Sequence, residues 1–361
     1  MAHILVSPLS WGLGHATRDI PLIREFLARG HRVTVLSSGR SLDLLKREVP
    51  SCVFLTLADY PTPYTSSPFF IAKFASFIPR MLRAIREEEE AFHRLCGEKA
   101  FDLIVSDNRF GIWSPTVPSF IISHQLRFAA PRIFCPFELI SQIFNASHHR
   151  HFLRVIVPDN PPELCAMSGR LSLSHMPATR ERIVFAGLLA SVEKIVVPED
   201  IDVLFSISGP EPQRTELEKI VLRQVRNVPG KKIVLLGTPN RSFEERPDAD
   251  MLIKSHAGRE EMTGLMNRAR VIVTRSGYTT MMELAELDKK RALLIPTPGQ
   301  TEQEYLSWYY AKKGWFFSQS QYRLDLRRDL ARVVACPGFP PMPKTADNVR
   351  RLYEQVFAPC L

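Results

Sequence analysis

The chain has 361 residues, of which 45% are hydrophobic and 24% charged, which is typical of a globular protein with two separate cores. No apolar run approaches the roughly 20 residues that a membrane-spanning helix needs. The net charge of +9 favours an anionic partner such as a nucleotide or a phospholipid surface, whereas basic residues without interleaved aromatic side chains argue against nucleic acid.

The cysteines and the N-terminus predict a cytoplasmic protein. No basic segment precedes the first apolar run, so we expect no secretory signal. The cysteines are scattered, without the spacing of a metal or redox site, and we expect reduced thiols. They are Cys52, Cys96, Cys135, Cys165, Cys336 and Cys360. We expect no metal and no cofactor, and interpret His148, His149 and His151 as a surface cluster rather than ligands.

Short runs rich in β-branched residues alternate with helical patterns along the chain. Their lack of polar–apolar alternation is typical of parallel strands covered on both faces. In the first half the expected strands are Ile4–Ser7, Val33–Ser37, Val53–Leu57, Leu103–Ser106, Phe120–Ile122 and Val155–Val157. In the second half they are Val203–Ile207, Ile233–Leu236, Met251–Ile253, Val271–Thr274 and Ala292–Ile295. Helices such as Ile20–Ala28, Thr215–Val225 and Met262–Arg268 fit between them.

This order predicts an α/β protein of two Rossmann-like, doubly wound parallel-sheet domains. The region between Asn160 and Glu199 is rich in proline and polar residues, so we place the N-terminal domain at 1–180 and the C-terminal domain at 181–345. The last helix carries apolar residues on one face, and we expect residues 346–361 to pack back onto the first domain.

A glycine-rich turn, Gly12-Leu13-Gly14-His15, joins the first expected strand to the first helix. It lacks the third glycine of the dinucleotide fingerprint. It does place an imidazole at the mouth of a strand–turn–helix unit, where a histidine can accept a proton near neutral pH.

A second turn contains Ser276 and Gly277 and is followed by Thr279 and Thr280. It lies where a strand ends and a helix begins, so free N–H groups and the helix dipole can hold a phosphate. Glu283 lies one to two helical turns further on, within reach of a sugar hydroxyl of a bound nucleotide. Further polar residues follow other strand ends, where ligands collect in such sheets. They are Asp107, His124, Gln125, Ser208 and Gly209.

These two turns, together with Pro296 and the Glu302-Gln303 pair, resemble the MurG-type glycosyltransferases of family 28. The resemblance covers most of the chain in architecture and is specific between about Gly258 and Ser307. It implies the GT-B fold, in which two Rossmann-like domains face each other across a cleft. It also implies inverting, metal-independent transfer of a hexose from a UDP-sugar to an acceptor hydroxyl.

The resemblance also implies roles for individual residues. Glu283 corresponds to the residue that binds the ribose hydroxyls, Thr279 and Thr280 lie at the diphosphate, and His15 lies where the acceptor meets the sugar. Gly258–Met262 cradles the uracil and Gln303 with Glu304 holds the donor sugar. The expected donor-binding residues are Ser208, Gly209, Arg214, Gly258, Arg259, Met262, Ser276, Gly277, Thr279, Thr280, Glu283, Gln303 and Glu304. The expected acceptor-binding residues are Gly12, Gly14, Arg18, His124 and Gln125.

His15 is the predicted catalytic base, with Asp107 as the second choice. The sequence departs from the family pattern in three places. Gln303-Glu304 replaces a glutamine pair, the first loop is not a run of glycines, and the loop Ser206–Arg214 is not a glycine–serine turn. These differences leave the donor sugar and the acceptor open.

The segment Phe69–Arg83 combines aromatic, aliphatic and basic residues. One interpretation is a core helix, continued by the exposed run Glu87–Glu90 with ion pairs four residues apart. The other is a flap that grips a lipid-linked acceptor at a membrane surface, which would make the protein peripheral to the inner face of a membrane. Two other functions stay open: a sugar-nucleotide epimerase or hydrolase of the same fold, and a non-catalytic nucleotide-sugar-binding protein.

Overall fold

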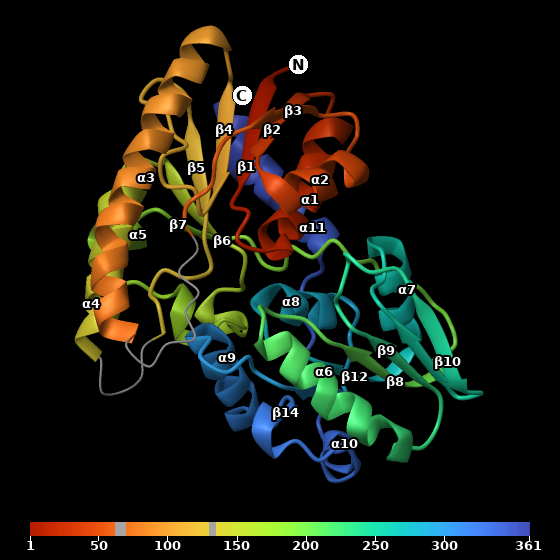
Figure 1. The fold of residues 1–361 in the computed structure, drawn as a ribbon. Coiled ribbons are helices and arrows are strands. Elements are labelled where there is room, and N and C mark those ends of the chain that lie inside the picture. The colour runs from red at the N-terminus through yellow and green to blue at the C-terminus, as the bar shows by residue number, and fades with distance from the viewer. Residues whose placement is uncertain (62–69, 130–134) are drawn as a thin grey trace. The chain divides into compact units, whose positions relative to one another are not determined.

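The computed structural model describes residues 1–61, 70–129 and 135–361. The chain divides into two compact units: unit 1 is Met1–Ser191 with Pro343–Leu361, and unit 2 is Val192–Met342. Each unit has a seven-stranded sheet with helices on its faces (Figure 1). The predicted pair of doubly wound units is thereby confirmed.

The sheet of unit 1 is entirely parallel, in the order β3-β2-β1-β4-β5-β6-β7. Its strands are β1 (His3–Pro8), β2 (Arg32–Ser37), β3 (Val53–Thr56), β4 (Leu103–Asp107), β5 (Ser119–Ile122), β6 (Arg154–Val157) and β7 (Ile183–Phe185). Its helices are α1 (Leu13–Ala28), α2 (Gly39–Glu48), α3 (Phe70–Glu98), α4 (Cys135–His149), α5 (Pro177–Arg180) and α11 (Thr345–Leu352).

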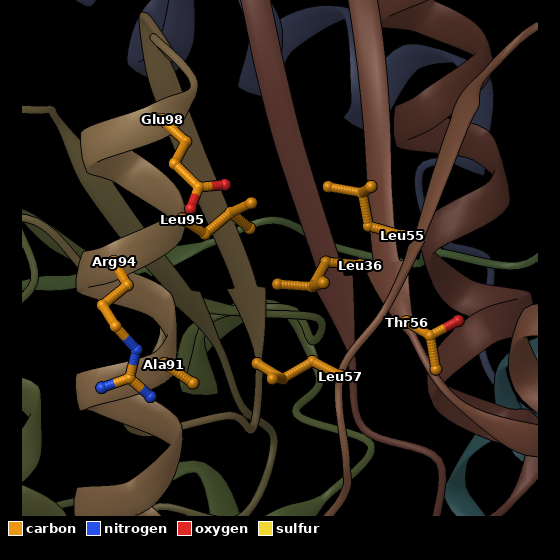
Figure 2. Close-up of a pocket in the computed structure, with 8 residues that line it drawn as sticks. All are labelled: Leu36, Leu55, Thr56, Leu57, Ala91, Arg94, Leu95 and Glu98. Atoms are coloured by element: carbon orange, nitrogen blue, oxygen red, sulfur yellow. The ribbon is translucent and has the colours of Figure 1, made fainter.

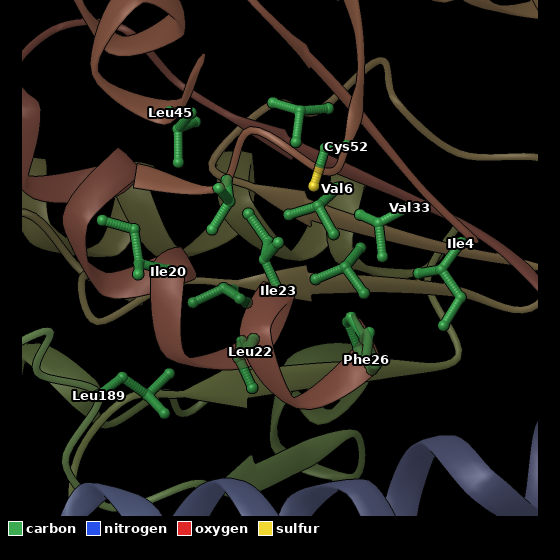
Figure 3. Packing of buried hydrophobic residues seen from close by; sticks show 14 of the residues in the cluster. Ile4, Val6, Ile20, Leu22, Ile23, Phe26, Val33, Leu45, Cys52 and Leu189 are labelled. Atoms are coloured by element: carbon green, nitrogen blue, oxygen red, sulfur yellow. The ribbon is translucent and has the colours of Figure 1, made fainter. Parts of the chain in front are cut away.

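Both faces of this sheet are buried, as its unalternated apolar strands require. On one face, Ile23 and Phe26 of α1 pack with Ile4, Val6 and Val33 of β1 and β2 (Figure 3). Residues Val349, Leu352 and Phe357 of the C-terminal segment join the same core. On the other face Phe92 of α3 packs with Leu5, Leu36 and Ile104.

The boundary between the units lies later than the sequence suggested. A boundary after residue 180 would separate β7 from β6, to which Val155, Ile156 and Val157 pair it in parallel register. Strand β7, Ile-Val-Phe, is apolar throughout but is not among the strands expected from the sequence.

The sheet of unit 2 has the order β10-β11-β9-β8-β12-β13-β14, parallel except for β10. Its strands are β8 (Ile201–Ser206), β9 (Lys232–Leu235), β10 (Glu244–Asp248), β11 (Met251–Lys254), β12 (Ala269–Thr274), β13 (Ala292–Leu294) and β14 (Phe317–Ser318). Its helices are α6 (Gln213–Gln224), α7 (Arg259–Arg268), α8 (Tyr278–Glu286), α9 (Thr301–Lys312) and α10 (Leu326–Val333).

One prediction for unit 1 is wrong. The histidine cluster is not on the surface: His149 is fully buried, burial lowers its pKa to about 3, and His151 stacks on Trp113 with centroids 4.3 Å apart.

Of the segment Phe69–Arg83, residue 69 and the side chains of 70–78 lie outside the described residues. Within its described end, Met81 belongs to the core and Leu82 is exposed. No helix among the described residues is long and apolar enough to cross a bilayer.

Candidate functional site

Each sheet has one point at which the strand order reverses, and ligands bind to such sheets beside that point, at the carboxyl ends of the strands. In unit 1 this point lies between β1 and β4, and in unit 2 between β8 and β12. His15 follows β1, and Asp107 is the last residue of β4. The helix after β1 begins at Leu13, earlier than predicted, so His15 lies in the first turn of α1 and Gly12 is its N-cap.

His15, Arg18 and Asp107 form one hydrogen-bonded cluster in unit 1. His15 Nδ1 lies 2.9 Å from Asp107 Oδ1. Arg18 donates through Nε to Asp107 Oδ2 at 2.6 Å and through Nη2 to Asp107 Oδ1. Its Nη1 lies 2.9 Å from His124 Nδ1, which must accept because a guanidinium only donates.

The position of Nδ1 decides the tautomer of His15. Arg18 Nη2 also lies 2.8 Å from this nitrogen, and one nitrogen cannot both accept from a guanidinium and donate to a carboxylate. Since Arg18 Nη2 already donates to Asp107, the tautomer with the proton on Nδ1 satisfies all three side chains. The lone pair is then on Nε2, which makes no hydrogen bond within the described part of the chain. The side chain is 17% exposed, so the imidazole is partly accessible from outside the cluster.

Asp107 holds the imidazole of His15 and is not itself the base. It is fully buried, so it has no access to an acceptor hydroxyl. Burial alone would raise the pKa of Asp107, but Arg18 and His15 hold it well below its usual range. A fully buried carboxylate of low pKa is a poor base, and we drop Asp107 as the alternative to His15.

The residues expected to bind the acceptor divide into two groups. Arg18 and His124 are buried beneath the accessible surface; Arg18 donates to Asp107, and His124 accepts from Arg18. Gly12 has open space where a Cβ would be. Gln125 is half-buried, and its carbonyl accepts from Asn145 Nδ2 at 3.1 Å. Gly14 accepts from the Thr17 hydroxyl within α1.

A buried polar network that the sequence did not reveal holds the loop before His15. Ser10 N donates to Asp59, and Trp11 Nε1 donates to the Tyr60 carbonyl at 2.9 Å. The Tyr60 hydroxyl bonds to Glu88 of α3. Arg109, just past β4, donates to Glu88 at 2.6 Å. Glu88 lies in the run predicted as an exposed face, and no local pattern distinguishes it from its neighbours.

In unit 2, Arg275 joins the loops at the carboxyl edge of the sheet. It is 2% exposed and donates to the carbonyls of Ser208, Gln213, Ile295 and Pro296 and to the side-chain oxygen of Gln321. None of these partners is a carboxylate. Burial lowers the pKa of Arg275 to about 10, which still leaves it charged at neutral pH.

The Ser276 turn is held from within. Ser276 is fully buried, and its hydroxyl donates to the Gln303 carbonyl at 2.8 Å. Gln303 accepts from the Thr297 N–H at 3.0 Å, and Glu304 accepts from the Gly299 N–H at 3.0 Å. The Ser276 hydroxyl is therefore structural, whereas the half-buried Thr279 and Thr280 hydroxyls make no hydrogen bond within the described residues.

Glu283 is paired with an arginine of the neighbouring helix. Arg259 Nη1, on the first residue of α7, donates to Glu283 Oε1 at 2.8 Å. Their side chains are 15% and 9% exposed. Both belong to the predicted donor site, and Met262 follows one turn along α7 with Gly258 as the N-cap. Helix α8 has Gly277 as its N-cap and no side-chain cap.

Arg214, expected among the donor-binding residues, is engaged by other groups of unit 2. It is 8% exposed and donates to Glu211, Glu218 and the Leu236 carbonyl. Two carboxylates neutralise it, so it fastens α6 to its own unit. Ser208 and Gly209, by contrast, are exposed at the end of β8.

Within the described residues no group of three histidine, cysteine or acidic side chains could hold a metal ion. A separate pocket of about 330 Å³ lies between α3 and the edge of the unit 1 sheet (Figure 2). It is lined by Leu36, Leu55, Thr56, Leu57, Ala91, Arg94, Leu95 and Glu98. None of these is a predicted site residue.

The chain resembles known glycosyltransferases in sequence. Residues 218–335 match the glycosyltransferase family 28 C-terminal domain. An uncharacterized glycosyltransferase of Methanosarcina acetivorans is 23% identical over 317 residues, which cover 81% of this chain and 79% of that protein.

Solved structures share the fold over nearly the whole chain. MurG of Acinetobacter baumannii has a TM-score of 0.56 at 14% identity, covering 98% of this chain and 100% of its own. The spinosyn rhamnosyltransferase SpnG, complexed with thymidine diphosphate, has a TM-score of 0.61 at 13% identity, covering 99% and 96%. LpCGTa in complex with UDP has a TM-score of 0.58 at 13% identity, covering 100% and 95%.

Proposed function

We propose that the chain, which has the GT-B fold and whose residues 218–335 match the family 28 C-terminal domain, moves a hexose from a UDP-sugar to an acceptor hydroxyl with inversion. The observation that carries the proposal is the His15–Asp107 pair, in which Nδ1 is held and Nε2 is left basic in a partly accessible imidazole. A non-catalytic nucleotide-sugar-binding protein has no use for this arrangement.

The donor binds unit 2 in this proposal. The diphosphate lies at the N-terminus of α8, where free N–H groups and the Thr279 and Thr280 hydroxyls donate to it. Arg275 adds a buried positive charge that no carboxylate among its partners neutralises. These groups stabilise the leaving diphosphate without a metal ion. Glu283 accepts from the ribose hydroxyls, and residues Gly258–Met262 lie against the base.

The acceptor hydroxyl gives its proton to His15 Nε2 as its oxygen attacks the anomeric carbon. The bond from that carbon to the diphosphate oxygen breaks, and UDP leaves. Asp107 orients the imidazole and stabilises the imidazolium that forms. A single displacement of this kind inverts the anomeric centre. Gln303 and Glu304 are assigned to the donor sugar.

An apolar or lipid-linked acceptor fits the surface of α4 best. Leu139, Ile140 and Ile143 are 49%, 54% and 53% exposed, and their spacing places them on one side of the helix. Exposed aliphatic side chains grouped in this way mark a contact with an apolar partner. The proposal therefore includes a protein that acts at the cytoplasmic surface of a membrane.

A panel of nucleotide sugars tests the donor. A ligand at 100 times its Kd stabilises the folded protein by about 2.7 kcal/mol, which is readily seen as a shift in Tm. We expect UDP-sugars and UDP to raise Tm more than thymidine diphosphate and its sugars. A larger shift with the thymidine series would change the donor base, and no shift with either would remove the nucleotide-sugar proposal.

Incubation with the donor alone separates transfer from the alternative epimerase or hydrolase. A transferase releases little free sugar until an acceptor is added. Rapid release of free or epimerised sugar without an acceptor would establish the alternative. An epimerase or hydrolase would need an acidic side chain near the anomeric carbon. Glu304, whose carboxylate accepts from the Gly299 N–H, is a candidate for that role.

A further inference from the structure

Asp19 is a buried acid next to the proposed base. It lies on α1, one residue after Arg18, and is fully buried. Among the described residues, no N–H or O–H group donates a hydrogen bond to either carboxyl oxygen of Asp19. The group that its carboxyl meets is another carboxyl, that of Asp107. Two carboxyl groups in contact away from water are stable only when one of them carries a proton.

The charges around this pair show which of the two holds the proton. Asp107 accepts from Arg18 and from His15, which favour its ionised form. Asp19 has the negative Asp107 as its neighbour and Arg18 beyond it. His124, after β5, accepts from Arg18.

The other elements packed against α1 place little charge near Asp19. Strands β1 and β2 contribute His3 and Arg32 at their far ends. The charged residues of α2 and α11, apart from the half-buried Glu48, are exposed. They are Arg40, Asp43, Lys46, Arg47, Asp347, Arg350 and Arg351. Exposed charges are screened by solvent, so Asp107 and Arg18 dominate the field at Asp19.

We propose that Asp19 is a positioning residue that stays protonated, donates its proton to Asp107 and thereby weakens the charge that Asp107 presents to His15. The consequence is that the imidazole keeps its lone pair at neutral pH instead of being held as an imidazolium. Burial, and then the charge of Asp107, raise the pKa of Asp19 well above its usual range. The consequence for catalysis rests on the proposed role of His15 as the base, but the protonation of Asp19 does not.

A protonated buried acid makes stability depend on pH. In the unfolded chain Asp19 ionises above about pH 4, whereas in the folded protein it ionises only at its raised pKa. The unfolded state therefore gains stability relative to the folded state as the pH rises between these two values. Asp19→Asn cannot ionise in either state, so it escapes this loss. Its amide also donates to Asp107 as the protonated acid does.

The experiment compares the full chain with Asp19→Asn, Asp19→Ala and the exposed control Asp43→Asn. Thermal unfolding is followed from pH 4 to pH 8, and the imidazole of His15 is titrated by NMR, with its signal assigned from His15→Gln. We expect Asp19→Asn to raise Tm at pH 8 by several degrees, since about 2–4 °C corresponds to 1 kcal/mol for a domain of this size. The gain should vanish near pH 4, and Asp43→Asn should show no such trend.

The titration separates a protonated from an ionised Asp19. If Asp19 is protonated, Asp19→Asn leaves the pKa of His15 nearly unchanged, because one neutral donor replaces another. Asp19→Ala removes the donor, strengthens the charge of Asp107 and raises the pKa of His15 by roughly 1 unit, the low end of the range for a nearby opposite charge. A purely structural Asp19 would move stability and leave both titrations unchanged.

The inference is overturned if Asp19→Asn lowers the pKa of His15, which would show that a negative charge was removed. It is also overturned if that variant is no more stable than the unsubstituted protein at pH 8. If Asp19→Asn does not fold, the protonation of Asp19 is tested with Asp19→Ala and with the pH dependence of the unsubstituted protein. An Asp19 that is ionised in the folded protein would cause no loss of stability between pH 4 and pH 8. None of these measurements uses turnover or nucleotide binding. The inference about Asp19 can therefore be wrong while the proposed function is right, and the proposed function can be wrong while the inference is right.

Discussion

Glu283 offers the sharpest test of the donor site, because the structure shows its carboxylate already in place. Arg259 Nη1 holds Oε1 at 2.8 Å, and the Glu283 side chain is 9% exposed. The carboxylate therefore loses little freedom when a ribose hydroxyl donates to it. A hydrogen bond to a charged group contributes about 1.5–3 kcal/mol, which is roughly 10- to 150-fold in affinity at 1.4 kcal/mol per decade.

We expect Glu283→Ala to weaken UDP binding within this range, measured by calorimetry on the full chain. Glu260→Ala is the matched control, since Glu260 is an exposed acid on α7 of the same unit. It should leave UDP affinity within about 2-fold, as surface substitutions usually change free energies by less than 0.5 kcal/mol.

The 2′-hydroxyl can be removed from the ligand as well as the carboxylate from the protein. The unsubstituted protein should bind 2′-deoxy-UDP less tightly than UDP, and Glu283→Ala should bind the two alike. Such a double cycle isolates the contact between the carboxylate and the ribose. If Glu283→Ala still prefers UDP as strongly as the unsubstituted protein does, Glu283 does not bind the 2′-hydroxyl and the reasoning from the α8 site is refuted.

The remaining predictions concern the base, the metal and one glycine. His15→Ala should lower turnover by about 10²–10⁴-fold, the usual effect of losing a general base, with little change in UDP affinity by calorimetry; lost folding stability with normal specific activity would make His15 structural. Turnover should survive EDTA, and a loss that magnesium or manganese restores would contradict metal-independent transfer. Gly111→Ala should lower the free energy of unfolding by about 1–3 kcal/mol, because its Cβ would lie 2.7 Å from Glu89 N and 2.8 Å from Ile85 O. Gly97→Ala, also measured by urea unfolding, should be neutral or stabilising, since nothing lies within 4 Å of its added Cβ.

The sequence by itself determined most of the two sheets and the turns at their switch points. Apolar runs such as Leu103–Ser106 need no tertiary information, because a strand buried on both faces is apolar throughout. The positions of His15 after β1 and of Thr279, Thr280 and Glu283 on α8 followed from chain order alone. The resemblance to family 28 rested on these same residues.

Two of the strands missed carry little side-chain pattern. Strand β10, Glu-Glu-Arg-Pro-Asp, is exposed and polar, and only its hydrogen bonds to β11 make it a strand. Strand β14 has two residues, of which Phe317 packs against the core. Two residues are too few to distinguish a strand from a loop.

Only the tertiary structure decided which polar residues serve the site and which hold it together. Arg18 and Arg214 have the same chemistry as a phosphate-binding arginine, yet carboxylates neutralise both: Asp107, 89 residues away, pairs with Arg18, and Glu211 and Glu218 of the same segment pair with Arg214, which is buried in unit 2. Arg275 has no carboxylate among its partners in the described part of the chain and keeps a buried charge beside the turn. The partners of a side chain are set by packing between distant segments, and the energy of a charge depends on those partners and on its burial. Local sequence contains neither, so the roles of these arginines, and of Asp19 beside Asp107, exist only in the folded chain.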